Sequence, residues 1–165
     1  VCTTSKIDKN NVIDYLNFPE RIYPVGRLDK ESTGLLLLTN NGQLMDDILR
    51  GSNYHEKEYI VHVNKPITDS VLQAMAQGVP ILDTITRPCK IRRMGKDCFY
   101  ITLTQGLNRQ IRRMCEYFDY RVTSLKRIRI MNIELGSLPV GKWRELTTSE
   151  IKTLKNLAQN KGEAE

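Results

Sequence analysis

Apolar residues recur along the chain with two different spacings, and each spacing predicts one type of element. Residues 57–64 alternate between apolar and polar side chains, which is the pattern of a strand with one buried face. Tyr59, Val61 and Val63 fall on one side of that strand. Residues 42–50 follow a helical period instead. The side chains expected on the buried stripe of this helix are Leu44, Ile48 and Leu49.

The same criteria predict the other elements. We expect further helices over residues 11–16, 68–77, 109–118 and 149–160. We expect further strands over residues 21–25, 35–38, 84–93, 98–105, 121–125 and 128–135. Residues 35–38 are four consecutive leucines, so this strand is predicted to be central in its sheet and buried on both faces.

Polar side chains at the predicted helix starts can accept hydrogen bonds from the free backbone N–H groups there. The residues predicted to cap helices in this way are Asn10 or Asn11, Asn41 and Asn108. Residues 147–150, Thr-Thr-Ser-Glu, have the spacing of a capping box and open the last helix.

Hairpins dominate this order of elements, which favours an α+β fold with a mixed, mostly antiparallel sheet flanked by helices. We assign residues 1–165 to one domain, because a chain of this length with 40% hydrophobic residues can bury a sizeable core. No apolar run approaches the roughly 18 residues that a membrane span needs, so we expect no membrane partner.

The cysteines are not spaced as metal ligands or as a disulfide framework. They are Cys2, Cys89, Cys98 and Cys115, and two histidines accompany them. We therefore expect reduced thiols, no metal site and a cytoplasmic protein. The sequence begins at Val1 without a Met, which suggests a piece of a longer protein. A monomer is the default expectation for its oligomeric state.

Positive charge is concentrated in one segment. The whole chain carries a net charge of +6, whereas residues 87–129 hold 12 Lys or Arg against 3 Asp or Glu. A local excess of this size attracts polyanions through counterion release, so it favours a nucleic-acid partner over a merely solubilising surface.

The segment Gly26 to Leu35 places one acid, Asp29, between Arg27 and Lys30, directly before the run of leucines. A carboxylate at the end of a rigid element is suited to catalysis, because rigid elements position reactive groups better than loops do. The alternative is a surface turn in which the aspartate makes local hydrogen bonds. The chain contains no phosphate-binding GxxxxGK[ST] loop, no GxGxxG turn and no GxSxG elbow, so we expect no nucleotide cofactor.

A second segment, residues 105–114, carries three arginines in a turn and the start of the predicted helix. They are Arg109, Arg112 and Arg113. A solvated basic helix face is the plain interpretation. However, positive charge in the first turn opposes the helix dipole, so an anion, either a phosphate or a carboxylate, is expected nearby.

Three segments together resemble the RsuA branch of the RNA pseudouridine synthases. They read GRLDKESTGLLLLTNNG, HEKEYIVHVNKPI and QGLNRQIRRMCEYFDYRV, and the resemblance extends from about residue 1 to residue 146 in the family's order. Within this branch the chain is most similar to the RluF-type enzymes, which act on uridine in large-subunit (23S) ribosomal RNA. The resemblance implies the pseudouridine synthase fold and the isomerisation of uridine to pseudouridine without a cofactor.

The resemblance also implies roles for individual residues. The invariant aspartate of the family falls on Asp29, which would act as the nucleophile on the ribose C1′ or on the pyrimidine ring. Its arginine partner falls on Arg112. The tyrosine that stacks on the target base falls on Tyr59, although strand statistics alone favour a core residue there. A leucine that lines the pocket falls on Leu125.

The target uridine must leave the RNA stack to reach a carboxylate, and basic side chains would hold the phosphates around it. The candidates for substrate binding are Arg27, Arg109, Arg113, Lys126, Arg127 and Arg129. The expected partner is large-subunit ribosomal RNA, with a tRNA as a possible second substrate.

The sequence departs from the family at its start, where an S4 RNA-binding domain and a first strand with a KPxG motif usually precede the catalytic domain. We therefore interpret residues 1–165 as the catalytic domain only. Two other functions compete with this one. The first is a non-catalytic RNA-binding or ribosome-assembly module on the same fold. The second is a metal-dependent nuclease, which would need clustered carboxylates, and Asp46 and Asp47 are the only adjacent acidic pair.

Overall fold

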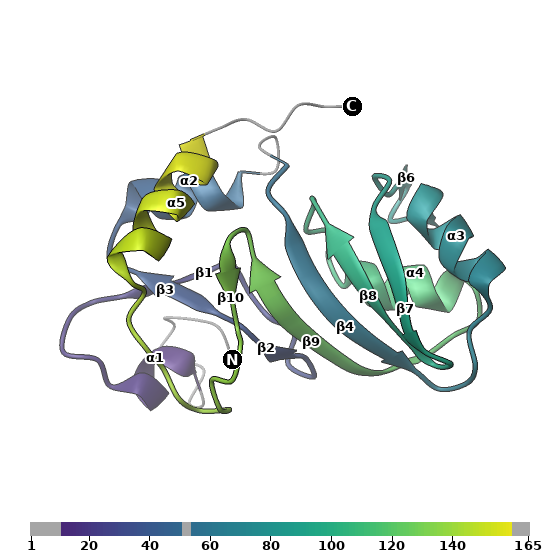
Figure 1. The fold of residues 1–165 in the computed structure, drawn as a ribbon, viewed down its shortest axis with the longest axis horizontal. Helices are drawn as coiled ribbons and strands as arrows, with labels where there is room; N and C mark the ends of the chain where they lie inside the picture. Colours follow the sequence, from purple (N-terminus) through teal and green to yellow (C-terminus); the bar gives the residue numbers. More distant parts are fainter. Residues whose placement is uncertain (1–10, 51–53, 160–165) are drawn as a thin grey trace.

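The computed structural model describes residues 11–50 and 54–159 (Figure 1). A six-stranded sheet forms its centre, in the order β10-β9-β4-β8-β7, with β2 paired to β9. Its strands are β2 (Thr33–Gly34), β4 (Lys57–Val63), β7 (Lys90–Gly95), β8 (Cys98–Leu103), β9 (Val122–Ile130) and β10 (Ile133–Glu134). Only the β2–β9 pair among them is parallel. The expected mixed, mostly antiparallel α+β architecture is thus confirmed.

The remaining described elements are short strands and helices. Two strand pairs lie outside the main sheet, β1 (Tyr23–Val25) with β3 (Leu37–Thr39) and β5 (Pro80–Ile81) with β6 (Thr84–Ile85). The helices are α1 (Val12–Leu16), α2 (Gly42–Leu49), α3 (Asp69–Gln77), α4 (Gln110–Tyr117) and α5 (Thr148–Gln159). None of these helices is both long enough and apolar enough to cross a bilayer.

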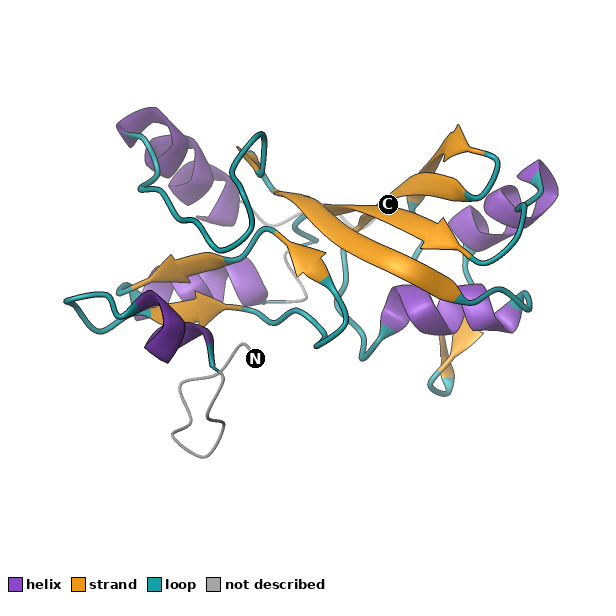
Figure 2. Cartoon of the chain, turned by 90° about the horizontal axis from the view of Figure 1, so that it is seen from below, coloured by secondary structure: helices purple, strands orange, loops and turns teal. Residues whose placement is uncertain are grey.

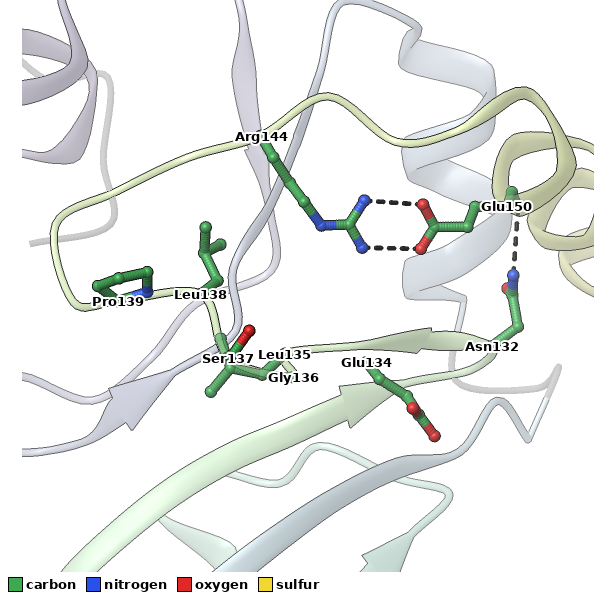
Figure 3. Close-up of a pocket in the computed structure, with 9 residues that line it drawn as sticks. All are labelled: Asn132, Glu134, Leu135, Gly136, Ser137, Leu138, Pro139, Arg144 and Glu150. Carbon is green, nitrogen blue, oxygen red and sulfur yellow. Dashed lines mark hydrogen bonds and ion pairs between the residues drawn. The ribbon is translucent and has the colours of Figure 1, made fainter.

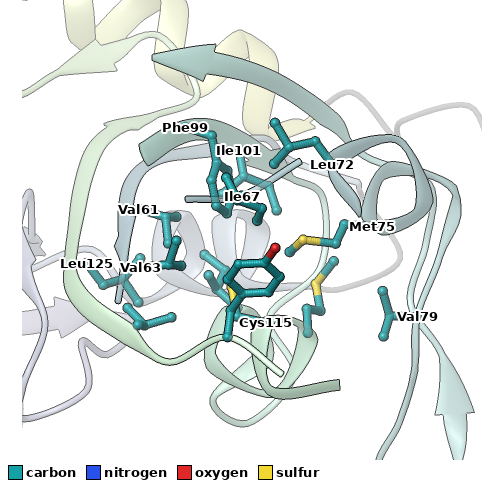
Figure 4. Close-up of a cluster of buried hydrophobic side chains, with 14 of the residues drawn as sticks. Val61, Val63, Ile67, Leu72, Met75, Val79, Phe99, Ile101, Cys115 and Leu125 are labelled. Carbon is teal, nitrogen blue, oxygen red and sulfur yellow. The ribbon is translucent and has the colours of Figure 1, made fainter. Parts of the chain in front are cut away.

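Two separate hydrophobic cores pack at the two ends of the sheet. Helices α3 and α4 lie at one end and α2 and α5 at the other, with β4 and β9 running between them (Figures 1 and 2). The first cluster, called here the α4 core, includes Val61, Phe99, Ile101, Met114 and Leu125 (Figure 4). The second, the α5 core, includes Leu35, Leu37, Ile130, Ile133 and Leu154.

One face of the sheet carries the α4 core and is called here the helix face. Residues directly opposite each other in neighbouring strands point to the same side. Val61 is opposite both Phe99 and Leu125, and all three are buried against α3 and α4. Tyr59 is opposite Ile101 and Arg127, so Tyr59 and Arg127 share that face. The alternation predicted for residues 57–64 is confirmed.

The strand predicted over residues 35–38 is confirmed only at Leu37 and Leu38, which belong to β3, and its predicted central position in the main sheet is wrong. The chain pairs with β9 only at Thr33 and Gly34, and the strand that follows, β3, pairs with β1 in a separate two-stranded sheet. Leu35 and Leu37 are buried, whereas Leu36 and Leu38 are half-buried. The leucines therefore fill one face of a short strand beside the α5 core, not the middle of the main sheet.

Gly34 allows this arrangement, because at this position the chain lies directly against β9. A Cβ atom there would lie 2.2 Å from the Arg127 carbonyl oxygen, and the backbone φ is +112°. No other residue type fits so close to a neighbouring backbone. The approach lets the Leu35 N–H donate to the Arg127 carbonyl at 2.8 Å.

Three other strand predictions are wrong in their extent. Residues 121–125 and 128–135 do not form two separate strands at the expected break, since β9 runs unbroken from Val122 to Ile130. Residues 84–93 do not form one strand, because Pro88 lies between β6 and β7 and has no N–H to donate to a ladder.

Most predicted helix caps are confirmed. Asn11 and Asn41 accept hydrogen bonds from backbone N–H groups three residues on, and Thr147 and Glu150 form the reciprocal capping box. Asn10 lies outside the described residues. Leu49, placed on the buried stripe of α2, is 41% exposed, so that assignment is wrong. Asn108 does not cap α4, whose N-cap is Arg109.

The described cysteines, Cys89, Cys98 and Cys115, are free thiols, and Cys2 lies outside the described residues. Burial raises the pKa of Cys89 to about 11 and that of Cys115 to about 12. Both thiols therefore stay protonated at neutral pH, which disfavours nucleophilic or redox chemistry at either.

Candidate active site

The loop that carries Asp29 connects β1 to β2 and is held to the main sheet by one buried arginine. Arg127 extends from β9, and its Nε donates to the Leu35 carbonyl at 2.8 Å and its Nη1 to the Arg27 carbonyl at 3.3 Å. Inside the loop, the Ser32 N–H donates to the Asp29 carbonyl at 2.9 Å. These bonds fix the backbone on both sides of Asp29, as a positioned reactive group requires.

Arg127 therefore does not lie where it was predicted. It is 3% exposed, and its guanidinium bonds to the two backbone carbonyls of the loop. A phosphate cannot reach a side chain this deeply buried, so the assignment of Arg127 to phosphate binding is wrong. The residue instead anchors the loop that carries the candidate nucleophile.

The carboxylate of Asp29 faces Arg112 of α4 across the space between the loop and the helix. Arg112 Nε lies 3.7 Å from Asp29 Oδ2, and the two side chains are 11% and 34% exposed. Arg112 Nη2 also donates to Ser32 Oγ at 3.2 Å. The expected pairing of Asp29 with Arg112 is therefore present in the geometry.

This ion pair is loose. A distance of 3.7 Å is too long for a hydrogen bond, and the buried Arg112 Nε has no hydrogen-bond partner among the described residues. Buried polar groups are normally satisfied, and each exception needs an explanation. Here the Asp29 carboxylate lies beside the unsatisfied donor but beyond hydrogen-bond distance.

The first turn of α4 has the anionic neighbours that its dipole requires. Besides Asp29, Glu31 of the same loop forms an ion pair with Arg109 at 3.4 Å. A backbone hydrogen bond, and after it the Arg109 guanidinium, lower the pKa of Glu31. The carboxylates of Asp29 and Glu31 thus provide the anionic compensation that the sequence predicted.

Tyr59 lies on the helix face of β4, partly buried against the α4 core. Its cross-strand neighbour on β9 is Arg127, which anchors the Asp29 loop. Leu125 is two residues from Arg127 on the same face and is 6% exposed. The register therefore brings Tyr59 and Leu125 to the face of the sheet on which α4 and the Asp29 loop meet.

The other basic residues fall into two groups. Arg27 and Lys126 are exposed and available to an external anion, and Arg109 is exposed but paired with Glu31 at 3.4 Å. Arg113 is half-buried and donates to the backbone and side-chain oxygens of Asn108. Arg129 is paired with Glu56 at 3.1 Å and donates to the Met131 carbonyl at 2.8 Å, so it is committed to internal contacts.

Sequence reasoning missed Ser32 and Lys57. Ser32 is the hydrogen-bond partner of Arg112, and Lys57 shares the face of β4 with Tyr59. The signal for Lys57 was available: it falls on the buried side of an alternating strand, where a charge is unusual. Ser32 had no comparable signal, because a serine in a loop is ordinary.

A cavity of about 510 Å³ lies elsewhere, between β10, the loop after it and the start of α5 (Figure 3). Its charged lining residues include Arg144 and Glu150, which bind each other through two hydrogen bonds of 2.7 and 2.8 Å. Within the described ranges, no three side chains of the metal-ligating types gather as a metal site would need.

Comparisons with known proteins agree on one family. Residues 3–117 match the family described as RNA pseudouridylate synthase. Over 159 residues the chain is 54% identical to the dual-specificity RNA pseudouridine synthase RluF of Salmonella typhi, covering 96% of this chain and 55% of that protein. It is 34% identical over 169 residues to the ribosomal large subunit pseudouridine synthase B of Bacillus subtilis, covering 97% and 69%.

A solved structure agrees with these sequence matches. The crystal structure of a pseudouridylate synthase superposes with a TM-score of 0.83 at 30% identity, covering 87% of this chain and 65% of that one. The chain spans little more than half the length of RluF, 55% of the Salmonella typhi protein. The similarity therefore covers nearly all of this chain and the corresponding part of longer relatives.

Proposed function

The chain belongs to the RNA pseudouridylate synthase family, and from this membership we propose that it converts uridine in large-subunit ribosomal RNA to pseudouridine with Asp29 as the nucleophile. The observation that carries the proposal is the contact of Asp29 with Arg112. The two side chains come from segments about 80 residues apart in the sequence, and the proposal adds Tyr59 of β4 as the third residue of the site.

The chemistry needs a carboxylate that can form and release a bond. Pseudouridine formation breaks the bond from N1 of uracil to the ribose C1′, turns the base, and forms a bond from C5 to C1′. The proton on C5 is lost and N1 gains one, so atoms and charge balance without a cofactor. Asp29 would attack either C1′ or the pyrimidine ring, and Arg112 would orient its carboxylate.

The substrate has to enter as a single extruded nucleotide. A base inside folded RNA is stacked and paired, so flipping costs a few kcal/mol, which stacking on Tyr59 and contacts to phosphates would offset. Arg27, Arg109 and Lys126 are exposed and Arg113 is half-buried, and these four residues are the proposed phosphate contacts. Leu125 would support the apolar side of the base site.

The names of the relatives guide the choice of RNA. One relative is named for the large ribosomal subunit and another for dual specificity, so we assign ribosomal RNA as the main substrate and a tRNA as a second one. We assign residues 1–165 to a catalytic domain that acts as a monomer in the cytoplasm.

Release of tritium from ribosomal RNA labelled at uracil C5 tests the proposal, because C5 loses its hydrogen only when the base is rejoined. The full-length protein is expected to release label, and Asp29→Ala is expected to release none while still binding RNA. Undiminished release by Asp29→Ala would exclude Asp29 as the nucleophile. RNA binding by the wild type without release of label would favour a non-catalytic RNA-binding module.

A further inference from the structure

Lys57 begins β4 on the face that carries Tyr59. The two side chains are two residues apart on one strand, which corresponds to about 6.5 Å between their Cα atoms. Lys57 is opposite Leu103 on β8 and Ile130 on β9. Leu103 belongs to the α4 core and Ile130 to the α5 core, so Lys57 lies where the two cores meet.

The ammonium group of Lys57 has no ion-pair or hydrogen-bond partner among residues 11–50 and 54–159. A glutamate stands on each side of it in the sequence, but neighbouring residues in a strand point to opposite faces of the sheet. Glu56 pairs with Lys90 and Arg129, and Glu58 accepts from Thr102 Oγ1 and lies 3.7 Å from Arg129. Both carboxylates are thus engaged by other cations.

A second cation without a carboxylate lies close by. Arg127 is 97% buried, its neighbour across the ladder is Tyr59, and its Nη2 has no hydrogen-bond partner within the described part of the chain. Burial, and after it the positive charge of Arg127, lower the pKa of Lys57. Holding two cations close together in a half-buried site raises the free energy of the folded protein unless an anion binds beside them.

We propose that Lys57 is a further catalytic residue, whose ammonium group binds the uracil oxygen on which negative charge develops as the base leaves the ribose. The inference rests on the proposed function, because only a base stacked on Tyr59 would bring that oxygen to Lys57. Arg127, one layer deeper, adds positive potential without touching the base.

The electron balance of the reaction gives such a group a role. When the N1–C1′ bond breaks, its electron pair stays with the uracil ring, and the negative charge spreads over N1, O2 and O4. Lys57 donates a hydrogen bond to one of these oxygens and keeps its proton. When C5 bonds to C1′, the charge disperses again, so the contact is strongest while the base is detached.

An anionic oxygen could also come from a phosphate of the target nucleotide, and the two sources predict different kinetics. A phosphate is equally charged throughout the reaction, so its contact contributes to RNA affinity. The uracil oxygen gains charge only during the reaction, so its contact contributes to the rate of the chemical step.

The test compares Lys57→Met with Lys57→Arg and uses Lys90→Met as the matched control. Lys90 is exposed on β7 and belongs to the neighbouring ion pair with Glu56. Label release in single turnover with saturating enzyme gives the rate of the chemical step, filter binding gives RNA affinity, and thermal unfolding reports the fold. Lys57→Gln replaces Lys57→Met if the methionine variant does not fold.

Lys57→Met is expected to slow the single-turnover rate by roughly 100-fold or more with RNA affinity within about threefold, as removal of one oxyanion donor does elsewhere. Lys57→Arg is expected to keep most of the rate, and Lys90→Met all of it. An RNA with 5-fluorouracil at the target adds a readout. Fluorine stabilises negative charge on the departing base, so the loss of rate in Lys57→Met should be smaller with this RNA. Chromatography measures the conversion of the fluorinated nucleotide.

Three results would overturn the inference while the wild type remains active. They are an unchanged rate in Lys57→Met, a loss of affinity without a loss of rate, and equal losses with uracil and 5-fluorouracil. The second result would assign Lys57 to a phosphate, and the third would assign it a structural role. An inactive wild type would instead contradict the proposed function itself.

Discussion

Two arginine–carboxylate pairs in this protein differ in their distances and hydrogen bonds, and we relate this difference to a structural role for one and a catalytic role for the other. Arg144 and Glu150 lie at the start of α5 and make two hydrogen bonds of 2.7 and 2.8 Å, and Glu150 also closes the capping box with Thr147. Arg112 is more buried than Arg144, yet its closest approach to Asp29 is 3.7 Å and its Nε has no hydrogen-bond partner among the described residues.

The better hydrogen-bond geometry belongs to the Arg144–Glu150 pair, which has no proposed part in the reaction. A carboxylate held by two strong hydrogen bonds is satisfied and has little reason to bind anything else. A carboxylate in a looser, half-buried contact keeps accessible oxygens and is still oriented by a nearby charge. We therefore propose the pair with the unsatisfied donor as the reaction centre and assign the satisfied pair to the start of the helix.

Among substitutions that keep the charge, the largest effect is expected for Asp29→Glu, which moves the carboxylate outward by one methylene. A nucleophile displaced by about 1 Å loses at least about 100-fold in rate, and we expect a loss of about 1,000-fold because the loop backbone is fixed by Arg127. Single-turnover label release measures this. A loss below about tenfold would show that the loop is not a rigid support.

Arg112→Lys is expected to have the next largest effect. Lysine keeps the positive charge but cannot reach Asp29 and Ser32 Oγ together, since it has one nitrogen where arginine has a planar fork. We expect roughly a 100-fold slower chemical step with RNA affinity nearly unchanged. The matched control is Arg144→Lys, which should leave the rate at the wild-type value, and equal losses in both variants would remove the contrast between the pairs.

Arg127→Met tests whether the Asp29 loop depends on its buried anchor. The substitution leaves the carbonyls of Leu35 and Arg27 without this donor, and unsatisfied buried groups cost about 1–3 kcal/mol. Urea denaturation should therefore show a free energy of unfolding lower by about that amount. RNA affinity should change less than for Lys126→Met, because Lys126 is exposed and Arg127 is not. A larger loss of RNA affinity in Arg127→Met than in Lys126→Met would instead assign Arg127 to phosphate binding.

The smallest effect is expected at the satisfied pair. The hydrogen bond from Arg144, and after it the one from the Thr147 backbone, lower the pKa of Glu150 to about 2. Because the pKa is lower in the folded than in the unfolded state, this stabilisation is present above about pH 4.5 and lost as the pH falls toward 2. The difference in Tm between wild type and Glu150→Gln should shrink over that range. A difference independent of pH would contradict this.

The sequence predicted local features well, because they depend on neighbouring residues. Asn41 before α2, the Thr147–Glu150 capping box and the alternation of Tyr59, Val61 and Val63 all follow from short-range rules. The pairing of Asp29 with Arg112 was also predicted, although from family resemblance and not from spacing.

Features that depend on distant contacts could not be predicted. The leucines at 35–38 satisfy the rule for a buried central strand, but Gly34 brings the chain against β9 for only two residues. Arg127 and Arg129 were taken for phosphate ligands because of their charge, and only the fold shows their buried carbonyl and carboxylate partners. Charge in a sequence indicates a polyanion partner, but it does not show which cations remain free.

The most direct test compares Asp29→Asn and Glu150→Gln in the same label-release assay on ribosomal RNA. Each variant replaces one carboxylate of an arginine pair by an amide of the same shape, so packing is kept and only charge and nucleophilicity are lost. Asp29→Asn should release no label, and Glu150→Gln should release it at the wild-type rate. Release by Asp29→Asn at a rate close to that of wild type would contradict the assignment of the reaction centre.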